Sequence, residues 1–584
     1  MTTIYDDPQD FADDQLAGWL ALYADRVRGV HGGVVALPTA GAAPQVAVVI
    51  GGGSGHYPAF CGTVGPGLAT GAVVGNIFTS PSAAQVYSVA KAADQGRGVV
   101  LSFGNYAGDN MNFGLAAERL RAEGIDTRIV VATDDIASAT AVADRRGIAG
   151  DFSVFKAMGA AAAEGSDLDE VERIGNASNL ATRTIGVAFS GCTMPGAQEP
   201  LFTVPAGHLG LGLGIHGEPG IEDVPMLRAT ELAHLLVDKL FADRSPVAGE
   251  RVAPMLNGLG DTKYEELFLL WGRIAPLLEA RGLTLVEPEV GEIVTSLDMG
   301  GCSLTLQWLD DELERLWRAD AYTPGYRKMA APVSALVPAA SVADAAERDD
   351  ATPPATPASQ RAALTVRAAL RAMDELLRRE EDTLGRIDAV AGDGDHGRGM
   401  VKGVGAAAKA AGRADEAAGI AFLLGRAGSA WAEYAGGTSG VLWGAGLEAF
   451  GRSIGDDAEQ VSPQVVVDAA AAFAESIQHL GGAARGDKTL LDALLPFVDA
   501  LRERVDAGDD LAVAWGAAAQ VAEREARATA ELRPKVGRAR PLAEKSVGTP
   551  DAGATSMGMI LTTIADTLTA HQASIAATTE GTNA

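Results

Sequence analysis

The stretch QVAVVIGGGSGH, from Gln45 to His56, indicates how the first half of the chain folds. QVAVVI is a short run rich in β-branched residues, which is typical of a buried strand, and it leads into a glycine-rich turn. The same order recurs at Gly98–Phe103, which leads into GNYAGD and then into a helical pattern at Met111–Ala122. Further strands are expected at Arg128–Thr133, before Asp134-Asp135, and at Ile185–Ser190. This alternation predicts an α/β region with functional residues at the carboxyl ends of strands.

The second half of the chain differs from the first in composition and in the spacing of its apolar residues. A stretch rich in Ala, Pro and Ser, from about Met329 to Gln360, lacks a periodic apolar face and is interpreted as a flexible linker. Beyond it, apolar residues recur at helical spacing. The expected helices include Val366, Leu370, Met373 and Leu377, and the segments Ala417–Ala432, Val465–Ile477 and Leu490–Leu501. We therefore predict a multidomain chain: an α/β region of two subdomains at residues 1–330, a linker at 331–360, and an all-α helical barrel or bundle at 361–584.

Composition restricts the classes of function. The 584 residues carry a net charge of −29, which argues against nucleic acid and anionic membrane surfaces as partners. Three scattered cysteines provide neither a disulfide framework nor metal-ligand spacing. The acidic N-terminus lacks the apolar segment of a secretory signal, and no apolar run approaches the length of a membrane span. We expect a cytoplasmic protein.

The segment IDAVAGDGDHG, Ile387–Gly397, is the strongest indication of chemistry. Asp388, Asp393 and Asp395 are carried on a glycine-loosened loop after a predicted helix, where three carboxylates can converge on Mg²⁺. An EF-hand is excluded because the twelfth position, counted from Asp393, is Val404 instead of Glu. A solvated acidic turn remains the alternative from these residues alone.

Three further segments between predicted helices have the composition of an anion site. Residues 436–440, GGTSG, can surround phosphates with backbone N–H groups and two hydroxyls. Gly486-Asp487-Lys488-Thr489 and Gly537-Arg538 each offer a cation beside a turn. Each can equally be a helix cap or a plain turn. The P-loop sequence G-x-x-x-x-G-K-[ST] does not occur.

These C-terminal motifs, with GDKTLLDAL and GRARPLAEKSVGTPDAGA, resemble the nucleotide-binding helical domain of the dihydroxyacetone kinases. The resemblance implies ATP and two Mg²⁺ ions bridging its phosphates, with Asp388, Asp393 and Asp395 as metal ligands. One departure is Arg540-Pro541, where family members commonly have Ser-Tyr. The residues expected to contact the nucleotide are His396, Thr438, Ser439, Gly440, Gly486, Thr489, Arg538, Asp551 and Gly553.

The first half is similar to the ketose-binding domain of the same family. Six motifs match in order: GGGSGH, GNYAGD, DDI, RRGIAG, GLGLGIHGEPG and SLDMGGCSLTL. The resemblance implies that His216 adds to a ketone carbonyl as a hemiaminal, that Asp109 accepts the proton of a terminal hydroxyl, and that His56 hydrogen-bonds the substrate. A structural histidine and a helix N-cap are the plain alternatives for His216 and Asp109. The expected substrate site comprises Gly53, Ser54, Gly55, His56, Gly104, Asp109 and His216.

The pocket departs from the family pattern in ways that bear on the substrate. Members that use dihydroxyacetone read GGGSGHEP and KNYTGD, whereas this chain has Tyr57, Gly104 and Ala107 at the Glu, Lys and Thr positions. Loss of the lysine leaves room for one more hydroxymethyl group, so we expect the four-carbon ketose erythrulose, with dihydroxyacetone as the rival. The rival holds if Tyr57 or Phe103 refills the space.

Two other classes of function remain open at this level: a non-catalytic ketose-binding regulator, and a kinase supplied by a phosphocarrier protein. The fusion of both regions in one chain favours free ATP as donor. We expect a homodimer, with the linker allowing the helical domain to reach the ketose.

Overall fold

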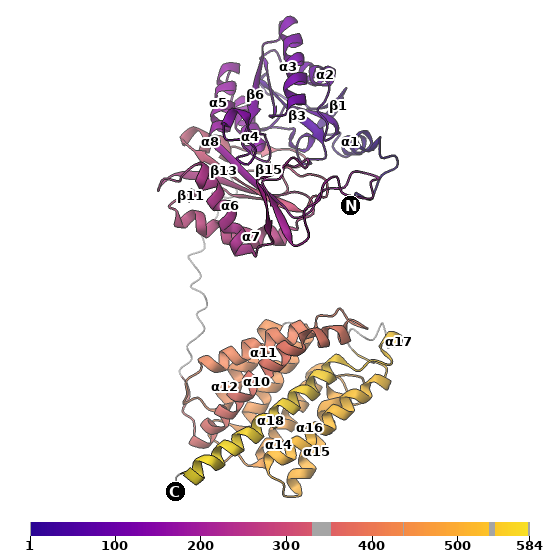
Figure 1. Cartoon of the computed structure of the whole chain (residues 1–584), viewed down its shortest axis with the longest axis vertical. Helices are drawn as coiled ribbons and strands as arrows, with labels where there is room; N and C mark the ends of the chain where they lie inside the picture. The colour runs from indigo at the N-terminus through magenta and orange to yellow at the C-terminus, as the bar shows by residue number, and fades with distance from the viewer. Residues whose placement is uncertain (1, 330–351, 436, 537–542, 582–584) are drawn as a thin grey trace. The chain divides into compact units, whose positions relative to one another are not determined.

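The computed structural model of the chain describes residues 2–329, 352–435, 437–536 and 543–581. The chain divides into two compact units, residues 1–340 and 341–584 (Figure 1). Most of the predicted linker lies outside the described residues. Its last residues belong to a helix that begins at Pro357, where the Thr356 side chain accepts a hydrogen bond from the Ser359 backbone N–H.

A six-stranded sheet forms the first layer of the first unit. The strand order is β1-β2-β4-β3-β5-β6, with parallel pairing between β3 and β4, β3 and β5, and β5 and β6. The strands are β1 Val27–Val30, β2 Gly33–Ala36, β3 Ala47–Ser54, β4 Gly71–Ile77, β5 Val99–Gly104 and β6 Thr127–Ala132. The associated helices are α1 Phe11–Leu22, α2 Ala83–Ala93, α3 Ala107–Ala122, α4 Asp151–Ala163 and α5 Leu168–Leu180.

Both faces of this sheet are buried, as parallel strands require. Val49 shares a core with α2 and α3, whereas its neighbours Val48 and Ile50 share a core with α4 and α5. The predicted strands are confirmed, with β3 continuing into the glycine run as far as Ser54. His56 and Asp134 therefore follow the carboxyl ends of two parallel strands of one sheet.

A seven-stranded sheet forms the second layer, in the order β11-β10-β13-β7-β8-β9 with β12 also paired to β10. Helices α6 and α7 cover one face, and residues of the other face join α4 and α8 in a shared core. The elements are β7 Thr182–Ala188, β8 His208–Leu211, β9 Glu222–Pro225, α6 Ala229–Asp243, β10 Arg251–Gly258, α7 Tyr264–Ala280, β11 Thr284–Leu285, β12 Glu289–Gly291, β13 Gly301–Leu309 and α8 Asp311–Arg318. A hairpin of β14 Ala321–Tyr322 and β15 Arg327–Lys328 follows.

The second unit is helical, and its helices close into a barrel. Each long helix packs on the next in sequence, and the last, α18, contacts both α16 and α10 (Figure 1). The helices are α10 Pro357–Asp388, α11 His396–Arg413, α12 Ile420–Ala435, α13 Gly437–Ile454, α14 Pro463–Gly481, α15 Leu491–Asp506, α16 Leu511–Ala528, α17 Ala543–Ser546 and α18 Ala552–Gly581.

Small residues and aromatic rings shape the barrel. Gly428 and Gly444 let α12 and α13 approach closely, because a Cβ on either would lie within 2.6 Å of the other's carbonyl oxygen. Beside this crossing, Trp431 and Trp443 stack with ring centroids 4.8 Å apart. The barrel contains a mainly apolar, partly open cavity of about 520 Å³. The predicted amphipathic stripe is confirmed, since Leu370, Met373 and Leu377 are buried.

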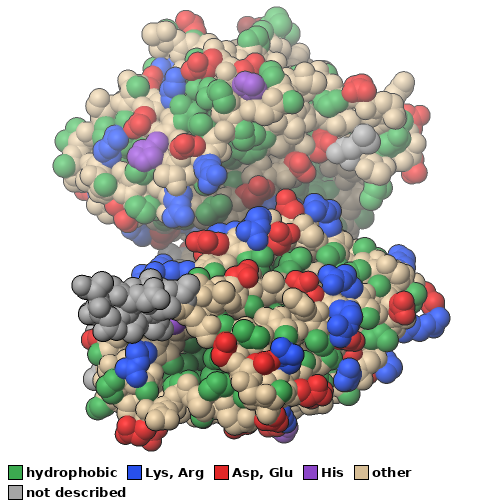
Figure 2. All heavy atoms as spheres, turned by 60° about the horizontal axis from the view of Figure 1, so that its bottom comes forward, with side chains coloured by type: hydrophobic (Ala, Val, Ile, Leu, Met, Phe, Trp, Pro, Cys, Tyr) green, Lys and Arg blue, Asp and Glu red, His purple; other side chains and the backbone are tan. Residues whose placement is uncertain are grey.

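Acidic and basic side chains intermingle on the faces of the two units that Figure 2 shows. Among the described residues, none of the helices combines the length and apolarity that crossing a bilayer demands.

Candidate functional sites

His56 and His216 meet at one point although 160 residues separate them in sequence. His56 lies in the turn after β3, and His216 lies in the connection between β8 and β9. Their Nε2 atoms are 3.1 Å apart, and His56 Nδ1 is 2.7 Å from the carbonyl oxygen of Thr295. Because that carbonyl can only accept, His56 carries a proton on Nδ1 and directs Nε2 at His216. Burial, followed by the charge of His216, lowers the pKa of His56 to about 3.

Glu218 fixes the orientation of the His216 ring. The Nδ1 atom of His216 is 2.9 Å from Glu218 Oε1, and the backbone N–H of His216 donates to Oε2 over 3.0 Å. Burial opposes ionisation of Glu218, but the hydrogen bonds and charge of His216 outweigh it and lower the pKa of Glu218 to about 2. The ionised carboxylate therefore requires a proton on His216 Nδ1. With both Nδ1 atoms protonated, each ring turns its Nε2 toward the other.

A second ion pair supports Glu218. Arg146 Nη1 lies 3.8 Å from Glu218 Oε2, and Arg146 Nη2 lies 2.8 Å from Oδ2 of the buried Asp135. A Cβ at Gly214 would be 2.1 Å from Glu218 Oε2 and 2.6 Å from Arg146 Nη1, so a side chain there would displace one or both of these groups. Glu218, Arg146 and Asp135 all lie in motifs that the sequence made conspicuous, but we predicted no role for them. A carboxylate two positions after a histidine in a glycine-rich turn was the available signal.

Aromatic rings and Asp109 surround the pair. Phe78 has its ring centroid 5.0 Å from that of His216, and Tyr106 has its centroid 5.2 Å from His216. Asp109 lies in the first turn of α3, is 8% exposed, and has no hydrogen-bond partner on Oδ1 among the described residues. Burial raises the pKa of Asp109 to about 6, against the opposing effects of Ser80 and His216. A carboxylate with this pKa is suited to act as a general base near neutral pH.

The remaining predicted ketose-site residues lie at the ends of β3 and β5. Gly53 packs so closely on the chain at Thr79 that a Cβ would be 2.6 Å from its backbone nitrogen. Ser54 is buried, its hydroxyl unpartnered within the described part of the chain, and Gly55 has a φ of +100°, which favours glycine. Gly104 ends β5.

The rival three-carbon interpretation needs Tyr57 or Phe103 to refill the space beside Gly104, and both side chains have other surroundings. Tyr57 is 41% exposed, and Phe103 packs on Phe113 with ring centroids 4.3 Å apart. Apart from its neighbours in the chain, the atoms nearest to a Cβ at Gly104 belong to Gly147, Tyr106 and Asp151.

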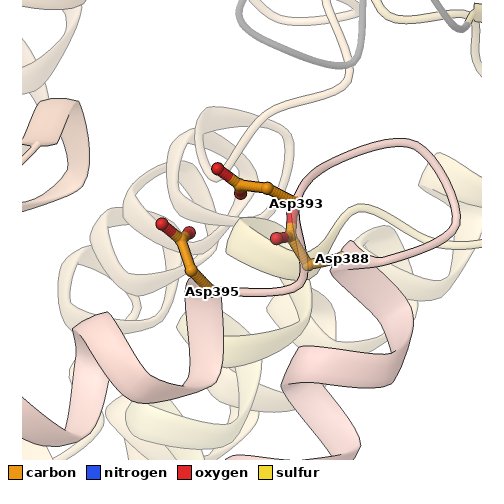
Figure 3. A group of neighbouring side chains, drawn as sticks. All are labelled: Asp388, Asp393 and Asp395. Atoms are coloured by element: carbon orange, nitrogen blue, oxygen red, sulfur yellow. The ribbon is translucent and has the colours of Figure 1, made fainter. Parts of the chain in front are cut away.

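In the second unit, the three aspartates converge on the loop between α10 and α11 (Figure 3). Each contributes a carboxylate oxygen within 4.8 Å of the others. Both intervening glycines are required: a Cβ at Gly392 would be 2.5 Å from Asp388 Oδ1, and Gly394 has a φ of +76°. Asp388 Oδ2 is buried without a partner among the residues that the structure describes. Three like charges this close, with one oxygen unsatisfied, fit a hard divalent cation such as Mg²⁺.

Several predicted nucleotide residues lie around this loop. His396 begins α11, and its Nε2 is 3.0 Å from Ser556 Oγ in the first turns of α18; burial lowers its pKa. Asp551 accepts a hydrogen bond from the Ala554 backbone N–H, and burial raises the pKa of its carboxyl to about 6. A Cβ at Gly553 would be 3.1 Å from Asp551 Oδ1. The His396–Ser556 contact therefore brings the start of α18 to the aspartate loop between α10 and α11.

Residues 437–440 begin α13 instead of forming a loop. Thr438 is exposed and Ser439 half-buried, while Gly440 packs on α12, where a Cβ would be 3.1 Å from the Ala432 carbonyl oxygen. The preceding helix end, Ala435, lies against Gly403 of α11. The first turn of a helix presents backbone N–H groups that lack intrahelical partners and can bind phosphate.

The turn at residues 486–489 is organised by Asp492, for which we predicted no role from the sequence. The backbone N–H groups of Gly486 and Thr489 both donate to the Asp492 carboxylate, the latter over 2.8 Å. Lys488 does not provide the expected free cation, because its Nζ donates to the carbonyl oxygens of Leu532 and Ser546. The Arg538 prediction lies outside the described residues.

Comparisons with known proteins agree with this geometry. Residues 17–325 match the Dak1 domain, and residues 390–566 match the DAK2 domain. The chain is 57% identical to D-erythrulose kinase of Mycolicibacterium smegmatis, covering 97% of this chain and 99% of that protein. It is 52% identical to L-erythrulose kinase of Pectobacterium atrosepticum, covering 97% of each chain.

A solved structure extends the match to the whole fold. The dihydroxyacetone kinase of C. freundii in complex with AMP-PNP and Mg²⁺ is 28% identical, with a TM-score of 0.57, over 97% of this chain and 99% of that chain. One polypeptide thus carries both domains over nearly its full length, and the chain belongs to the dihydroxyacetone kinase family.

Proposed function

We propose that the chain is an ATP-dependent kinase that phosphorylates a terminal hydroxyl of erythrulose. The observation that carries the proposal is the Glu218–His216–His56 array, in which a carboxylate fixes one ring nitrogen of His216 and leaves the other facing the site. Two relatives at 57% and 52% identity act on erythrulose by their names, which supports the four-carbon substrate. Dihydroxyacetone is the second candidate, supported by the name of the solved relative.

The array can trap a ketone as a hemiaminal. His216 Nε2 attacks the carbonyl carbon, a C–N bond forms, and the π electron pair moves to oxygen. The new alkoxide oxygen takes a proton from solvent, His56 Nε2 can accept a hydrogen bond from the resulting hydroxyl, and the positive charge stays on the His216 ring opposite Glu218. A polyol has no carbonyl to trap, so the step selects ketoses over polyols of similar shape. It also orients the substrate for transfer.

Asp109 supplies the base for the next step. Its carboxylate, close enough to His216 for the charges to interact, accepts the proton of the attacking terminal hydroxyl. In the helical unit Asp388, Asp393 and Asp395 would hold Mg²⁺, two ions by the family resemblance, and the metal would neutralise phosphate charge.

Two finer statements belong to the proposal. We infer a homodimer, for which β9 offers an edge strand flanked by the exposed Ile221 and Met226. We infer a reducing, cytoplasmic location, which agrees with the free thiols of Cys61, Cys192 and Cys302.

A product assay tests the function. The purified chain is incubated with Mg²⁺-ATP and either D-erythrulose, L-erythrulose, dihydroxyacetone or glycerol, with ADP release measured and the product identified by ³¹P NMR. We expect the highest kcat/KM with one erythrulose enantiomer and no turnover of glycerol. His216→Ala should abolish turnover, whereas the matched variant His208→Ala, on β8, should retain it. A higher kcat/KM for dihydroxyacetone than for either erythrulose enantiomer would overturn the substrate assignment.

A further inference from the structure

Residues 295–297, which we call the bridge segment, form hydrogen bonds to the turns of both histidines. The segment lies in the connection between β12 and β13 of the second sheet. Its last two residues begin the motif SLDMGGCSLTL, for which the sequence indicated no role. Thr295 and Ser296 are buried, so their hydroxyl groups need partners inside the protein.

The bridge segment holds the turn of His56 through backbone and side-chain groups. The Thr295 carbonyl oxygen is 2.7 Å from His56 Nδ1, and the Thr295 N–H donates to the His56 carbonyl oxygen over 3.3 Å. The Thr295 hydroxyl donates to the carbonyl oxygen of Tyr57 over 3.0 Å. The Leu297 N–H donates to the carbonyl oxygen of Gly55 over 2.9 Å. Three consecutive residues of this turn are therefore bonded to the bridge segment.

The same segment holds the turn of His216 through the side chain of Ser296. The fully buried Ser296 hydroxyl donates to the carbonyl oxygen of Ile215, the residue before His216. The N–H of the same peptide group, which belongs to His216, donates to Glu218. The peptide group is therefore held at both ends: by Glu218 from within its own turn, and by Ser296 from the segment that also holds His56.

The bridge segment is itself fixed to the second sheet. The Oδ1 atom of the buried Asn257, on β10, accepts the N–H groups of Ile293 over 2.8 Å and Val294 over 2.9 Å. Its Nδ2 donates to the Val294 carbonyl oxygen over 2.7 Å. Leu297 has a φ of +50°, which a bulky side chain rarely adopts, and such strain persists where the surrounding contacts enforce it. The bridge segment is therefore held in one conformation.

We propose that the bridge segment sets the distance between the two imidazole rings, and that Ser296 is a positioning residue for the nucleophile His216. Because the same three residues hold both turns, they fix the Nε2 atoms 3.1 Å apart. A displacement of a reacting group by about 1 Å can cost about a hundredfold in rate. The role in catalysis rests on the proposed function, whereas the geometric role does not.

The test replaces Ser296 by Ala and measures both the distance and the kinetics. Ser296→Ala removes the donor to the Ile215 carbonyl and should lengthen the distance between the two Nε2 atoms by about 1 Å in a crystal structure. The KM for the ketose that the wild type prefers should rise by at least about tenfold, because the hemiaminal forms less readily, while the KM for ATP stays unchanged. A simple loss of folded protein would instead lower kcat and leave both KM values unchanged.

The matched control is Ser102→Ala, on β5. The Ser102 hydroxyl is also fully buried and also donates to a backbone carbonyl oxygen, that of Val130 on β6. Its removal should therefore cost the fold a similar hydrogen bond but leave the distance between the rings and the KM for the ketose unchanged.

Thermal melting reports whether each variant folds. If Ser296→Ala does not fold, Thr295→Val carries the test, since it removes the hydroxyl bonded to Tyr57 and should lengthen the same distance and raise the same KM. An unchanged distance in the variant that folds, or a loss confined to kcat, would overturn the role of the bridge segment and leave the proposed function standing. If the wild type phosphorylates no ketose, the proposed function fails, and the distances in the variants still decide the geometric role.

Discussion

Replacing Glu218 by Gln tests the arrangement that makes His216 a nucleophile. In the wild type the carboxylate accepts from both Nδ1–H and the backbone N–H of His216. A glutamine has one acceptor and one donor on its amide. With its oxygen on the backbone N–H, its NH₂ faces Nδ1, which must then accept. The proton moves to Nε2, and the lone pair that attacks the ketone is lost.

The size of the effect follows from the same contacts. A pKa of about 2 for Glu218 corresponds to about 3 kcal/mol in favour of its ionised form, or roughly a hundredfold. Exchange of carboxylate for amide behind a catalytic histidine in serine proteases costs about 10⁴-fold through the wrong tautomer. We therefore expect Glu218→Gln to lower kcat/KM by about 10²- to 10⁴-fold.

The assay is steady-state ADP release, with ¹⁵N NMR of the histidines reporting which nitrogen of His216 carries the proton. Glu222→Gln, an exposed carboxylate on β9, is the matched control and should behave as wild type. Activity of Glu218→Gln within tenfold of wild type, or an Nε2 lone pair retained in its spectrum, would refute the reasoning.

Three other perturbations probe the general base, the metal loop and the support of Glu218. Because burial raises the pKa of Asp109 to about 6, kcat/KM should rise as the pH increases through about 6. The ionised carboxylate lowers the free energy of unfolding by up to about 3 kcal/mol above that pH and by nothing below about pH 4. Asp109→Asn should therefore be inactive yet melt at a higher temperature than wild type at pH 7, and a less stable variant would contradict this. Asp388→Asn should weaken the binding of Mn²⁺ or Mg²⁺, measured by calorimetry, by at least about tenfold. Without metal the same variant should melt at a higher temperature than wild type, because it removes one of three neighbouring like charges. Unchanged metal binding would exclude the aspartate loop as the metal site. Gly214→Ala should separate Glu218 from Arg146 and reduce kcat/KM by at least about tenfold. The control Gly18→Ala, at an open position on α1, should keep the wild-type kcat/KM. A wild-type kcat/KM for Gly214→Ala would show that Arg146 does not position Glu218.

Sequence patterns predicted the elements of both units because their signals are local. β-branched runs at Gln45–Ile50 and Gly98–Phe103 and the stripe of Leu370 and Leu377 each reflect burial of one segment. The aspartate loop could also be predicted from the sequence, because the conformation of the loop itself requires Gly392 and Gly394.

Contacts between segments that are distant in sequence could not be predicted from such local patterns. The pairing of His56 with His216 depends on the two sheets meeting, and Gly104 and Gly147 approach each other closely from separate segments. Lys488 was misread because nothing local indicates that the carbonyl groups of Leu532 and Ser546 bind its amine. The loop expected at residues 436–440 was wrong for residues 437–440, which begin α13. Gly440 packs against α12 there, a contact that the local sequence does not indicate.

The capture of a ketose by His216 is tested most directly by ¹³C NMR of erythrulose labelled at its carbonyl carbon and bound to the protein without ATP. Capture predicts that the bound carbon leaves the carbonyl region for that of a tetrahedral carbon joined to nitrogen, and that His216→Ala abolishes this signal. A bound ketose that keeps its carbonyl resonance in the wild-type protein would contradict capture by His216.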